Sequence, residues 1–345
     1  MNIVMALLAL GFLIFIHELG HFWAARATGV RVDEFAVGFG PSIIKHQRNG
    51  VLYRLNWIPL GGYVKMYGED NPEAAAAPDN FNNRPVGARI LVIVAGVIMN
   101  IIGAFVILAL LFNIYGAPTP NLFVGSVQEG KPGAAAGLLA GDQIKWVEGK
   151  ELKSPVDFNS AVQKHADTPM EIGVLRDGNR VDLTVTPKMN VEENRPMIGI
   201  GLQQQTSFVK AGGFGENTRQ ALRSTGELTA LTFNGFKQLV TGAVSFKEIG
   251  GPVEIIRITG QASDNGVPHY MYIVALLSVN LAVLNILPFP ALDGGRLVFL
   301  LVEWVRRGKR ISLEREASIN FVGILFLLTL MVVVTFKDVF NIFSN

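Results

Sequence analysis

The chain contains no cysteine among its 345 residues. This absence excludes disulfide bonds, zinc sites built from thiolates and cysteine nucleophiles, although it does not identify a compartment. A metal ion in this protein must therefore be held by histidine, aspartate or glutamate side chains.

Charged residues are also scarce. They make up 17% of the chain, the formal net charge is +2, and there is no long basic run. This balance does not favour a nucleic-acid-binding surface, so nucleic acid is not an expected partner. Half of the residues are hydrophobic and the mean hydropathy is +0.35. These values predict a multi-span protein of the lipid bilayer that carries a soluble part.

Four segments are long and apolar enough to form transmembrane helices. The first has no basic residue before His17, and cleavage as a signal peptide would destroy the site that its histidines form, so we expect it to be retained as a span. The predicted spans are residues 1–25, 90–115, 271–295 and 317–337.

The first predicted span contains the motif HELGH at residues 17–21. Residues four apart lie on one helix face, so His17 and His21 are placed to bind a single zinc ion. Glu18 need not bind the metal, because it can act as the general base on a water whose pKa zinc has lowered to roughly 7. The motif predicts amide hydrolysis. The structural alternative is a polar cluster satisfied by neighbouring helices.

The third predicted span runs into the sequence NILPFPALDGG at residues 285–295. Its two prolines are expected to break the helix close to a carboxylate. Asp293 is the only acidic residue between Asp264 and Glu303. It is therefore the candidate third zinc ligand, with water in the open fourth position. The alternative role for this carboxylate is a helix-end cap.

Residues 26–89 are polar, rich in glycine and punctuated by proline, which predicts β-hairpins. An edge of such a sheet can pair with an extended peptide, and a plain cytosolic loop is the alternative. Strands are expected over 30–37, 51–58 and 62–67, turns over 38–41 and 59–62, and a flexible linker over 70–83.

From residue 117 to about 187 the chain reads as a soluble α/β module. Its segment GAAAGLLAGDQI at residues 133–144 resembles the loop, short helix and strand of bacterial PDZ domains, so we assign residues 117–190 to one PDZ domain. Such domains bind extended peptide ends beside a strand, and a purely steric role is the equal alternative. Strands are expected over 124–127, 143–147, 171–175 and 181–186, and a helix over 156–165.

The next region, residues 191–270, contains an expected amphipathic helix over 217–240 that lies at the membrane surface. Basic residues follow the first span, and six more lie in the loop expected over 296–316. Because short basic loops stay in the cytoplasm, both loops are placed there. The PDZ domain, the 191–270 region and both termini then lie on the extracytoplasmic side.

Three motifs occur in order along the chain: H-E-x-x-H, the PDZ-like insert, and N-x-x-P-x-P-x-L-D-G. Together they resemble the site-two protease family of intramembrane zinc metalloproteases, peptidase family M50, in its bacterial RseP type. The resemblance extends to residues 38–40, 59–66 and 81–87. One departure is that the best-known members of this type carry two PDZ domains, whereas this chain shows one.

The resemblance implies a four-span α-helical membrane protein with a re-entrant β element over residues 35–67 and an inserted α/β PDZ domain. It implies a zinc metalloendopeptidase of the bacterial inner membrane that acts in regulated intramembrane proteolysis. The expected substrates are single-span membrane proteins, such as anti-sigma factors, and remnant signal peptides. Zinc ligation is implied for His17, His21 and Asp293, and the general base is Glu18.

The resemblance also implies that Asn285 binds the substrate near the metal, either by clamping the peptide backbone or by donating to the oxyanion. Two other functions remain open. A divalent-metal transporter also places histidines and an aspartate at membrane depth, and a catalytically silent PDZ scaffold also keeps the metal-binding fold. Replacement of Glu18 by Gln separates these functions, because it should abolish proteolysis alone.

Overall fold

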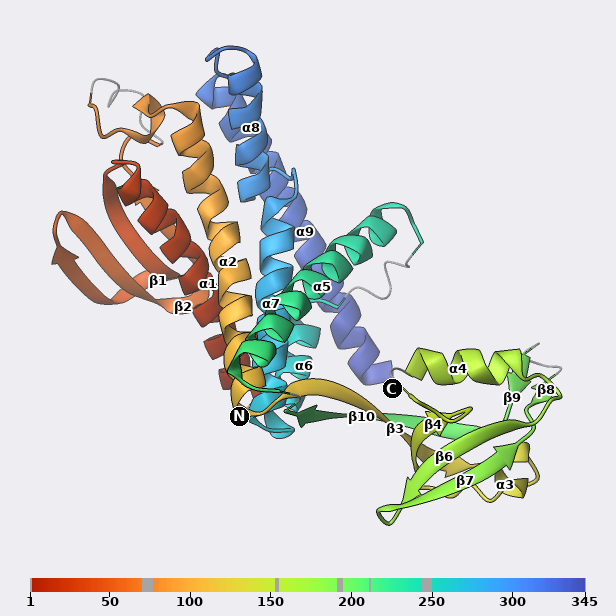
Figure 1. The fold of residues 1–345 in the computed structure, drawn as a ribbon. Coiled ribbons are helices and arrows are strands. Elements are labelled where there is room, and N and C mark those ends of the chain that lie inside the picture. The colour runs from red at the N-terminus through yellow and green to blue at the C-terminus, as the bar shows by residue number, and fades with distance from the viewer. Residues whose placement is uncertain are drawn as a thin grey trace. The chain divides into compact units, whose positions relative to one another are not determined.

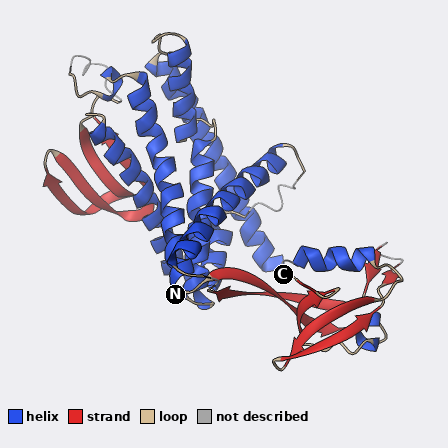
Figure 2. Cartoon of the chain, in the orientation of Figure 1, coloured by secondary structure: helices blue, strands red, loops and turns tan. Residues whose placement is uncertain are grey.

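The computed structural model describes residues 2–69, 77–152, 155–190, 195–210, 212–243 and 250–344. The chain divides into two compact units (Figure 1). One comprises Met1–Ile114 with Gly212–Asn345, and the other comprises Tyr115–Ala211. The first unit is mainly helical with one β-hairpin, and the second consists mainly of strands, as Figure 2 shows.

Among the described residues, four helices are long and apolar enough to cross a membrane, which agrees with the four predicted spans. Each contains at least 20 consecutive helical residues, the length needed to cross a hydrocarbon core. The chain is therefore a multi-pass membrane protein. The four helices are α1 (Asn2–Ala27), α2 (Val86–Ile114), α7 (Val267–Ile286) and α9 (Leu313–Ser344).

Helices α1 and α2 approach each other closely because small residues lie at their crossing. A Cβ atom on Gly20 of α1 would lie 2.4 Å from the carbonyl oxygen of Ala95 in α2. Only glycine permits this approach, as at other close crossings of membrane helices. On its other side α2 packs against α7, where the Ser278 hydroxyl donates to the carbonyl oxygen of Asn100 at 2.7 Å.

The third span is shorter than the predicted range 271–295, because α7 ends at Ile286 and residues 287–292 are not helical. The two prolines in this segment lack the N–H that helix continuation requires. A further helix, α8 (Asp293–Val305), then begins at Asp293. The prediction of a loop over 296–316 is therefore wrong up to Val305. Leu297 and Leu300, three residues apart, place one face of α8 in the core.

The hairpin of the first unit consists of β1 (Val32–Arg48) and β2 (Val51–Met66). Asn49 and Gly50 join the strands, and both have positive φ, as a tight type I′ turn requires. The strands fold into a small sheet of four segments. Residues 32–37 lie between 62–66 and 52–55, and residues 42–48 pair with 51–56.

The turns predicted at 38–41 and 59–62 are instead irregular positions inside these long strands. Gly38, Gly40 and Gly61 have positive φ there, and the strand register shifts around them. The glycines therefore bend the strands and do not end them. The predicted linker over 70–83 lies outside the described residues at 70–76. Its remainder contains the 3-10 helix η2 (Phe81–Asn83), which Asn80 caps.

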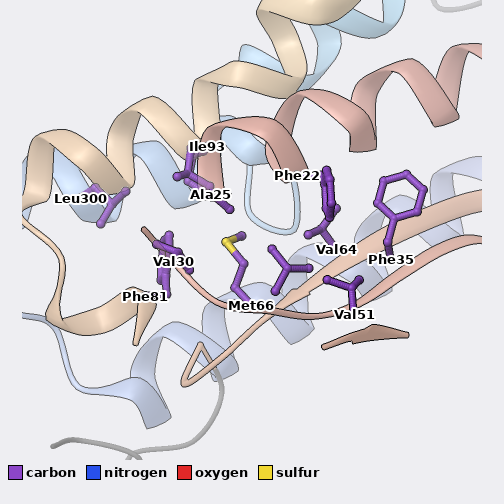
Figure 3. Close-up of a cluster of buried hydrophobic side chains, with 12 residues drawn as sticks. Phe22, Ala25, Val30, Phe35, Val51, Val64, Met66, Phe81, Ile93 and Leu300 are labelled. Carbon is purple, nitrogen blue, oxygen red and sulfur yellow. The ribbon is translucent and has the colours of Figure 1, made fainter. Parts of the chain in front are cut away.

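A hydrophobic cluster fixes the hairpin against the helices (Figure 3). Phe35 of β1 packs edge-to-face against Phe22 of α1, with the ring centroids 5.4 Å apart. Val64 and Met66 of β2 are buried in the same cluster, together with Ile93 of α2. The cluster thus holds residues 62–66 beside the part of α1 that carries the histidine motif.

Two further helices complete the first unit: α5 (Phe214–Val240) and α6 (Pro252–Asp264). Helix α5 covers the region of the predicted amphipathic helix and runs obliquely across α2 and α7 (Figure 1). Asn113 of α2 donates to the Thr218 hydroxyl at 3.2 Å, and Thr232 donates to Asn280 of α7 at 2.8 Å. These hydrogen bonds attach α5 to both spans.

The second unit contains one sheet in the order β10-β3-β4-β6-β7, with β5 paired to β4. The helices α3 (Pro132–Ala135) and α4 (Pro155–Lys164) accompany it, and β8 (Lys188–Asn190) pairs separately with β9 (Arg195–Met197). The sheet strands are β3 (Ala117–Val127), β4 (Gln143–Val147), β5 (Lys150–Glu151), β6 (Met170–Arg176), β7 (Asn179–Val185) and β10 (Ile200–Val209). The predicted strands and helix of this module lie at β3, β4, β6, β7 and α4.

The second unit extends to residue 211, beyond the boundary expected at 190. The extension is β10, which pairs with β3 from Ile200↔Val127 to Val209↔Ala117. The PDZ-like motif at residues 133–144 contributes to the position of the segment that begins this strand. The amide of Gly133 donates to the carbonyl oxygen of Ile198 at 2.7 Å, and a Cβ atom on Gly133 would lie 2.8 Å from the Ile200 side chain.

Candidate active site

Helix α1 brings His17 and His21 to one face, one turn apart, as their spacing predicts. Their Nε2 atoms are 3.2 Å apart. Asp293, the first residue of α8, places Oδ2 at 3.1 Å from Nε2 of His17 and 3.3 Å from Nε2 of His21. Both histidines are buried. Three ligand-type atoms thus converge on one point, although Asp293 is 272 residues from His21 in the sequence.

The opposite side of each imidazole is held by α2. Nδ1 of His21 lies 2.8 Å from the carbonyl oxygen of Val92, which can only accept, so Nδ1 carries the proton. Nε2 of His21 is then an unprotonated acceptor that faces Asp293. This is the tautomer that a metal-binding histidine needs, with its other nitrogen fixed by a backbone carbonyl.

Asn100 of α2 holds the second imidazole, with its Nδ2 3.2 Å from Nδ1 of His17. The Oδ1 atom of the same amide is buried and has no hydrogen-bond partner among the described residues. A half-turn of the amide exchanges these two atoms. Oδ1 then accepts a hydrogen bond from the Nδ1–H group of His17, which leaves Nε2 free as a ligand.

Gly96 of α2 creates the space for both imidazoles. A Cβ atom at this position would lie 2.4 Å from Nε2 of His21 and 2.8 Å from Cε1 of His17. These distances are far below van der Waals contact, so no other residue type leaves the rings in place. Gly96 belongs to the site although it makes no polar contact.

The converging atoms fit a divalent cation. Oδ2 of Asp293 is buried and receives no hydrogen bond from the described part of the chain. A buried carboxylate oxygen without a donor, beside an unprotonated imidazole nitrogen, is unfavourable unless a cation lies between them. Two imidazole nitrogens and one carboxylate oxygen are ligands that zinc prefers, and three protein ligands leave a position open.

Glu18 lies on α1 beside the metal-ligand cluster and lines a cavity of about 430 Å³. The two histidines and Asp293 line the same cavity, and β2 residues 62–66 form its other wall. A Cβ atom on Gly62 would lie 3.0 Å from Cγ of Glu18. The glycine therefore leaves the room that the glutamate side chain needs to face the cavity.

Asn285, near the end of α7, also reaches this cluster, with its Nδ2 3.3 Å from Nε2 of His17. The five residues singled out from the sequence, His17, Glu18, His21, Asn285 and Asp293, are thus brought together. Sequence reasoning missed Val92, Gly96 and Asn100 as members of the site. No motif marks these residues, because α2 places them by its packing on α1.

Comparison with known proteins adds to this geometry. The chain is 32% identical to the regulator of sigma-W protease RasP of Bacillus subtilis, over 99% of each chain. It is 31% identical to the zinc metalloprotease RasP of Bacillus licheniformis, over 99% of this chain and 100% of that protein. The PDZ domain of an SdrC-like protein from Listeria innocua resembles 25% of this chain, at 24% identity, 96% coverage of that domain and a TM-score of 0.23.

The model of peptidase family M50 matches residues 5–330, a range that contains every residue of the cluster described above. Of these two relatives, matched over almost their whole length, one is named a protease and the other a zinc metalloprotease, and the buried cluster of this chain suits zinc. On these grounds the chain belongs to peptidase family M50 and is an intramembrane zinc metalloprotease.

Proposed function

We propose that this protein cleaves the membrane-spanning segments of single-span membrane proteins, with His17, His21 and Asp293 as the zinc ligands and Glu18 as the general base. The observation that carries the proposal is the convergence of three ligand atoms within a membrane-spanning unit, around a carboxylate oxygen that lacks a donor. A zinc ion held there supplies a Lewis acid that polarises a carbonyl group and makes a water molecule acidic near neutral pH.

The chain's own residues then have separate tasks. Val92 and Asn100 orient the two imidazoles, which keeps their Nε2 atoms directed at one point. Glu18 faces the same cavity and is placed to take a proton from the attacking water and pass it to the leaving amine. Asn285 lies beside His17, so its amide is placed to donate to the carbonyl oxygen of the scissile bond.

The hairpin is proposed to be the re-entrant β element. Its outer part exposes large apolar side chains that water would not favour but lipid would accept. Ile44 is 57% exposed and Trp57 is 67% exposed. Among the hairpin side chains that the structure describes, the other large apolar ones that are exposed are Phe39, Ile43, Leu55 and Ile58.

The same hairpin offers an edge to the substrate. Among the described residues, 62–66 pairs only with 32–37, and its other side faces the cavity that contains Glu18. A transmembrane helix hides its peptide bonds in internal hydrogen bonds, so it must unwind locally before cleavage. Pairing with residues 62–66 would replace the lost hydrogen bonds and present one carbonyl group at the site.

The proposed topology places both termini and Tyr115–Ala211 outside the cytoplasm, because basic residues follow the first span and lie between α7 and α9. The relative from Bacillus subtilis is named for the regulation of sigma-W. By analogy we propose membrane-bound anti-sigma factors as one substrate class and remnant signal peptides as another.

Two roles are proposed for the PDZ-like unit. Strand β10 is first in the sheet order, so one of its edges is open among the described residues and can accept an extended peptide. Alternatively, the bulk of the unit excludes substrates whose outer domain has not been removed. A peptide-binding assay with the full-length protein separates these roles, since only the first requires measurable affinity.

The test is cleavage of a tagged single-span substrate in liposomes, with the zinc content of each enzyme measured. Wild type should cut the substrate and contain about one zinc ion, as one His, His, Asp site requires. Glu18→Gln should contain the same zinc and cut at least about 10²-fold more slowly. Glu216→Gln, at an exposed position on α5, is the matched control and should behave as wild type.

Zinc in both proteins without cleavage of any of several substrates would instead support a transporter or a scaffold. Absence of zinc from well-folded wild type would contradict the ligand assignment.

A further inference from the structure

The segment that leads from α7 into Asp293 has an unusual backbone. Residues 287–292 are not helical, and Ala291 within them has a φ of 75°. This left-handed region is unfavourable for alanine, because its Cβ atom approaches the neighbouring carbonyl oxygen. Such a conformation persists only where the surrounding structure holds it. The position of Asp293, two residues later, depends on what holds Ala291.

Helix α9 provides that support through three successive contacts. Oδ1 of Asn320 accepts a hydrogen bond from the amide of Ala291 at 3.2 Å. A Cβ atom on Gly323 would lie 2.6 Å from Cβ and 2.7 Å from the carbonyl oxygen of Pro290. The ring of Phe326 packs against that of Phe289, with the centroids 5.5 Å apart.

The three contacting residues of α9 are spaced by three, so they lie along one face of the helix. They meet positions 291, 290 and 289 in reverse order, which shows that α9 runs antiparallel to this segment. Contact through one helix face, with a glycine at its centre, produces close packing against residues 289–291.

The rest of α9 contributes little packing. Only 11% of its membrane-spanning window is buried. Phe321, the neighbour of Asn320 on the opposite face, is 67% exposed. Near the other end of the helix, Asp338 accepts hydrogen bonds from the amides of Gly251 and Glu254, at 2.9 and 3.2 Å. The hydrogen bond from Ala291 to Asn320 is thus a polar attachment of α9 to the segment before Asp293.

We propose that Asn320 and Gly323 are positioning residues for Asp293, and that α9 serves the site as a brace for the segment that carries this carboxylate. The proposal rests on the assignment of Asp293 as a zinc ligand made above. Loss of the acceptor at position 320 frees the Ala291 peptide to rotate, which moves Asp293 relative to the histidines. Metal sites tolerate displacements of only about 0.2 Å in their ligand distances.

The experiment is chelator competition for zinc with the full-length protein in detergent, accompanied by thermal unfolding and by kcat and KM on a single-span substrate. Asn320→Leu and Gly323→Ala should each weaken zinc binding about 10-fold or more, the effect expected when the support of a metal ligand is removed. Their kcat should fall with KM unchanged, because the hairpin edge that binds substrate is untouched.

Two variants act as controls. Asn320→Asp keeps an acceptor oxygen toward Ala291, so it should bind zinc within about 2-fold of wild type. Phe321→Ala changes the exposed face of the same helix and should also bind zinc as wild type does. If Asn320→Leu does not fold, Gly323→Ala compared with Phe321→Ala still tests whether packing of α9 on this segment positions Asp293.

The outcomes separate this proposal from the one on which it rests. Wild-type zinc affinity in Asp293→Ala would overturn the ligand assignment, and the positioning role with it. Loss of zinc from Asp293→Ala together with wild-type affinity in Asn320→Leu and Gly323→Ala would overturn the positioning role alone. Equal losses in Asn320→Asp and Asn320→Leu would overturn the acceptor argument.

Discussion

Residues that have no polar side chain can determine whether the site forms. Gly96 is the clearest case, because a methyl group there would occupy the space of both imidazole rings. The polar contacts of His17 and His21 with α2 depend on the same closeness of α1 and α2. The free energy of metal binding at the proposed site should therefore depend on a residue that does not itself bind the metal.

This dependence gives a prediction at the scale of one methyl group. Gly96→Ala should lose at least about 10²-fold in kcat/KM, because a displacement of about 1 Å at a reacting centre has an effect of this size. Gly87→Ala is the matched control, since no atom lies within 4 Å of a Cβ at that position of the same helix. The measurement is cleavage of a single-span substrate. Equal activity in the two variants would contradict the role given to Gly96.

The site residues that could be predicted are those that a short stretch of sequence is enough to identify. His17 and His21 share a helix face, and Asp293 is isolated as the only acidic residue of its region. Asn285 entered through family resemblance. Gly96 and Val92 could not be found, because no spacing rule connects α2 to α1. Their roles follow from helix packing, which a single sequence does not specify.

At the scale of elements, a buried ion pair connects α2 to α8. Arg89 donates two hydrogen bonds to Glu303, at 2.9 and 2.6 Å, and both side chains are buried. Arg310 also donates to Glu303, at 3.1 Å. Because α8 begins with Asp293, this pair holds the helix whose first residue faces the histidines.

Removal of one partner of this ion pair should destabilise the protein more than removal of both partners. Glu303→Leu leaves the Arg89 charge buried without its main partner and should lower the free energy of unfolding by about 3–5 kcal/mol. Arg89→Met combined with Glu303→Leu should recover most of that loss, since no buried charge remains. Thermal unfolding in detergent measures both variants. A double variant as unstable as Glu303→Leu would show that the pair is not the cause.

Within the PDZ-like unit, the ion pair between Asp142 and Arg176 predicts a pH dependence. Burial raises the pKa of Asp142, but hydrogen bonds from Arg176 and from the Leu139 amide outweigh it, so the pKa lies below its ordinary value. The ionised pair therefore stabilises the unit in full above about pH 4, the pKa of an unfolded aspartate. That stabilisation is lost as the pH falls through the lower, folded value.

Arg176→Met should destabilise this unit by about 2 kcal/mol at pH 7, the scale of hydrogen bonds to a charged group. The difference from wild type should shrink as the pH falls below about 4, where Asp142 of the unfolded state takes up a proton, toward the lower pKa of the folded state. This difference in stability is measured by hydrogen exchange of the β4 and β6 amides in the full-length protein, corrected for the intrinsic exchange rate at each pH. Lys188→Met removes an exposed pair with Asp167 and should change stability by less than about 1 kcal/mol. A pH-independent difference for Arg176→Met would contradict the argument.

Helices and strands could be predicted where the apolar residues follow one clear pattern along the sequence. The four spans and strands β4, β6 and β7 follow from apolar runs and alternation. Helix α8 was taken for a loop because two glycines and a group of basic residues hide its apolar face. Strand β10 was not assigned because three consecutive glutamines interrupt its pattern, and its partner β3 lies about 80 residues earlier.

At the scale of the whole molecule, the site lies within the unit that contains the membrane-spanning helices. Glu18 and the two histidines lie on a helix apolar enough to cross a membrane, and the cavity beside them is lined by a hairpin edge. Hydrolysis there requires the substrate peptide to reach a buried site in extended form. The scissile bond should therefore lie within the substrate's own apolar segment.

The most direct test is to determine the cleaved bond. Wild type is reconstituted in liposomes with a tagged single-span substrate, and both product termini are sequenced by mass spectrometry. Glu18→Gln provides the background. The account predicts one bond, or a few adjacent bonds, inside the apolar span, cut by wild type only. Cleavage confined to the polar flanks outside the span would contradict intramembrane proteolysis at this site.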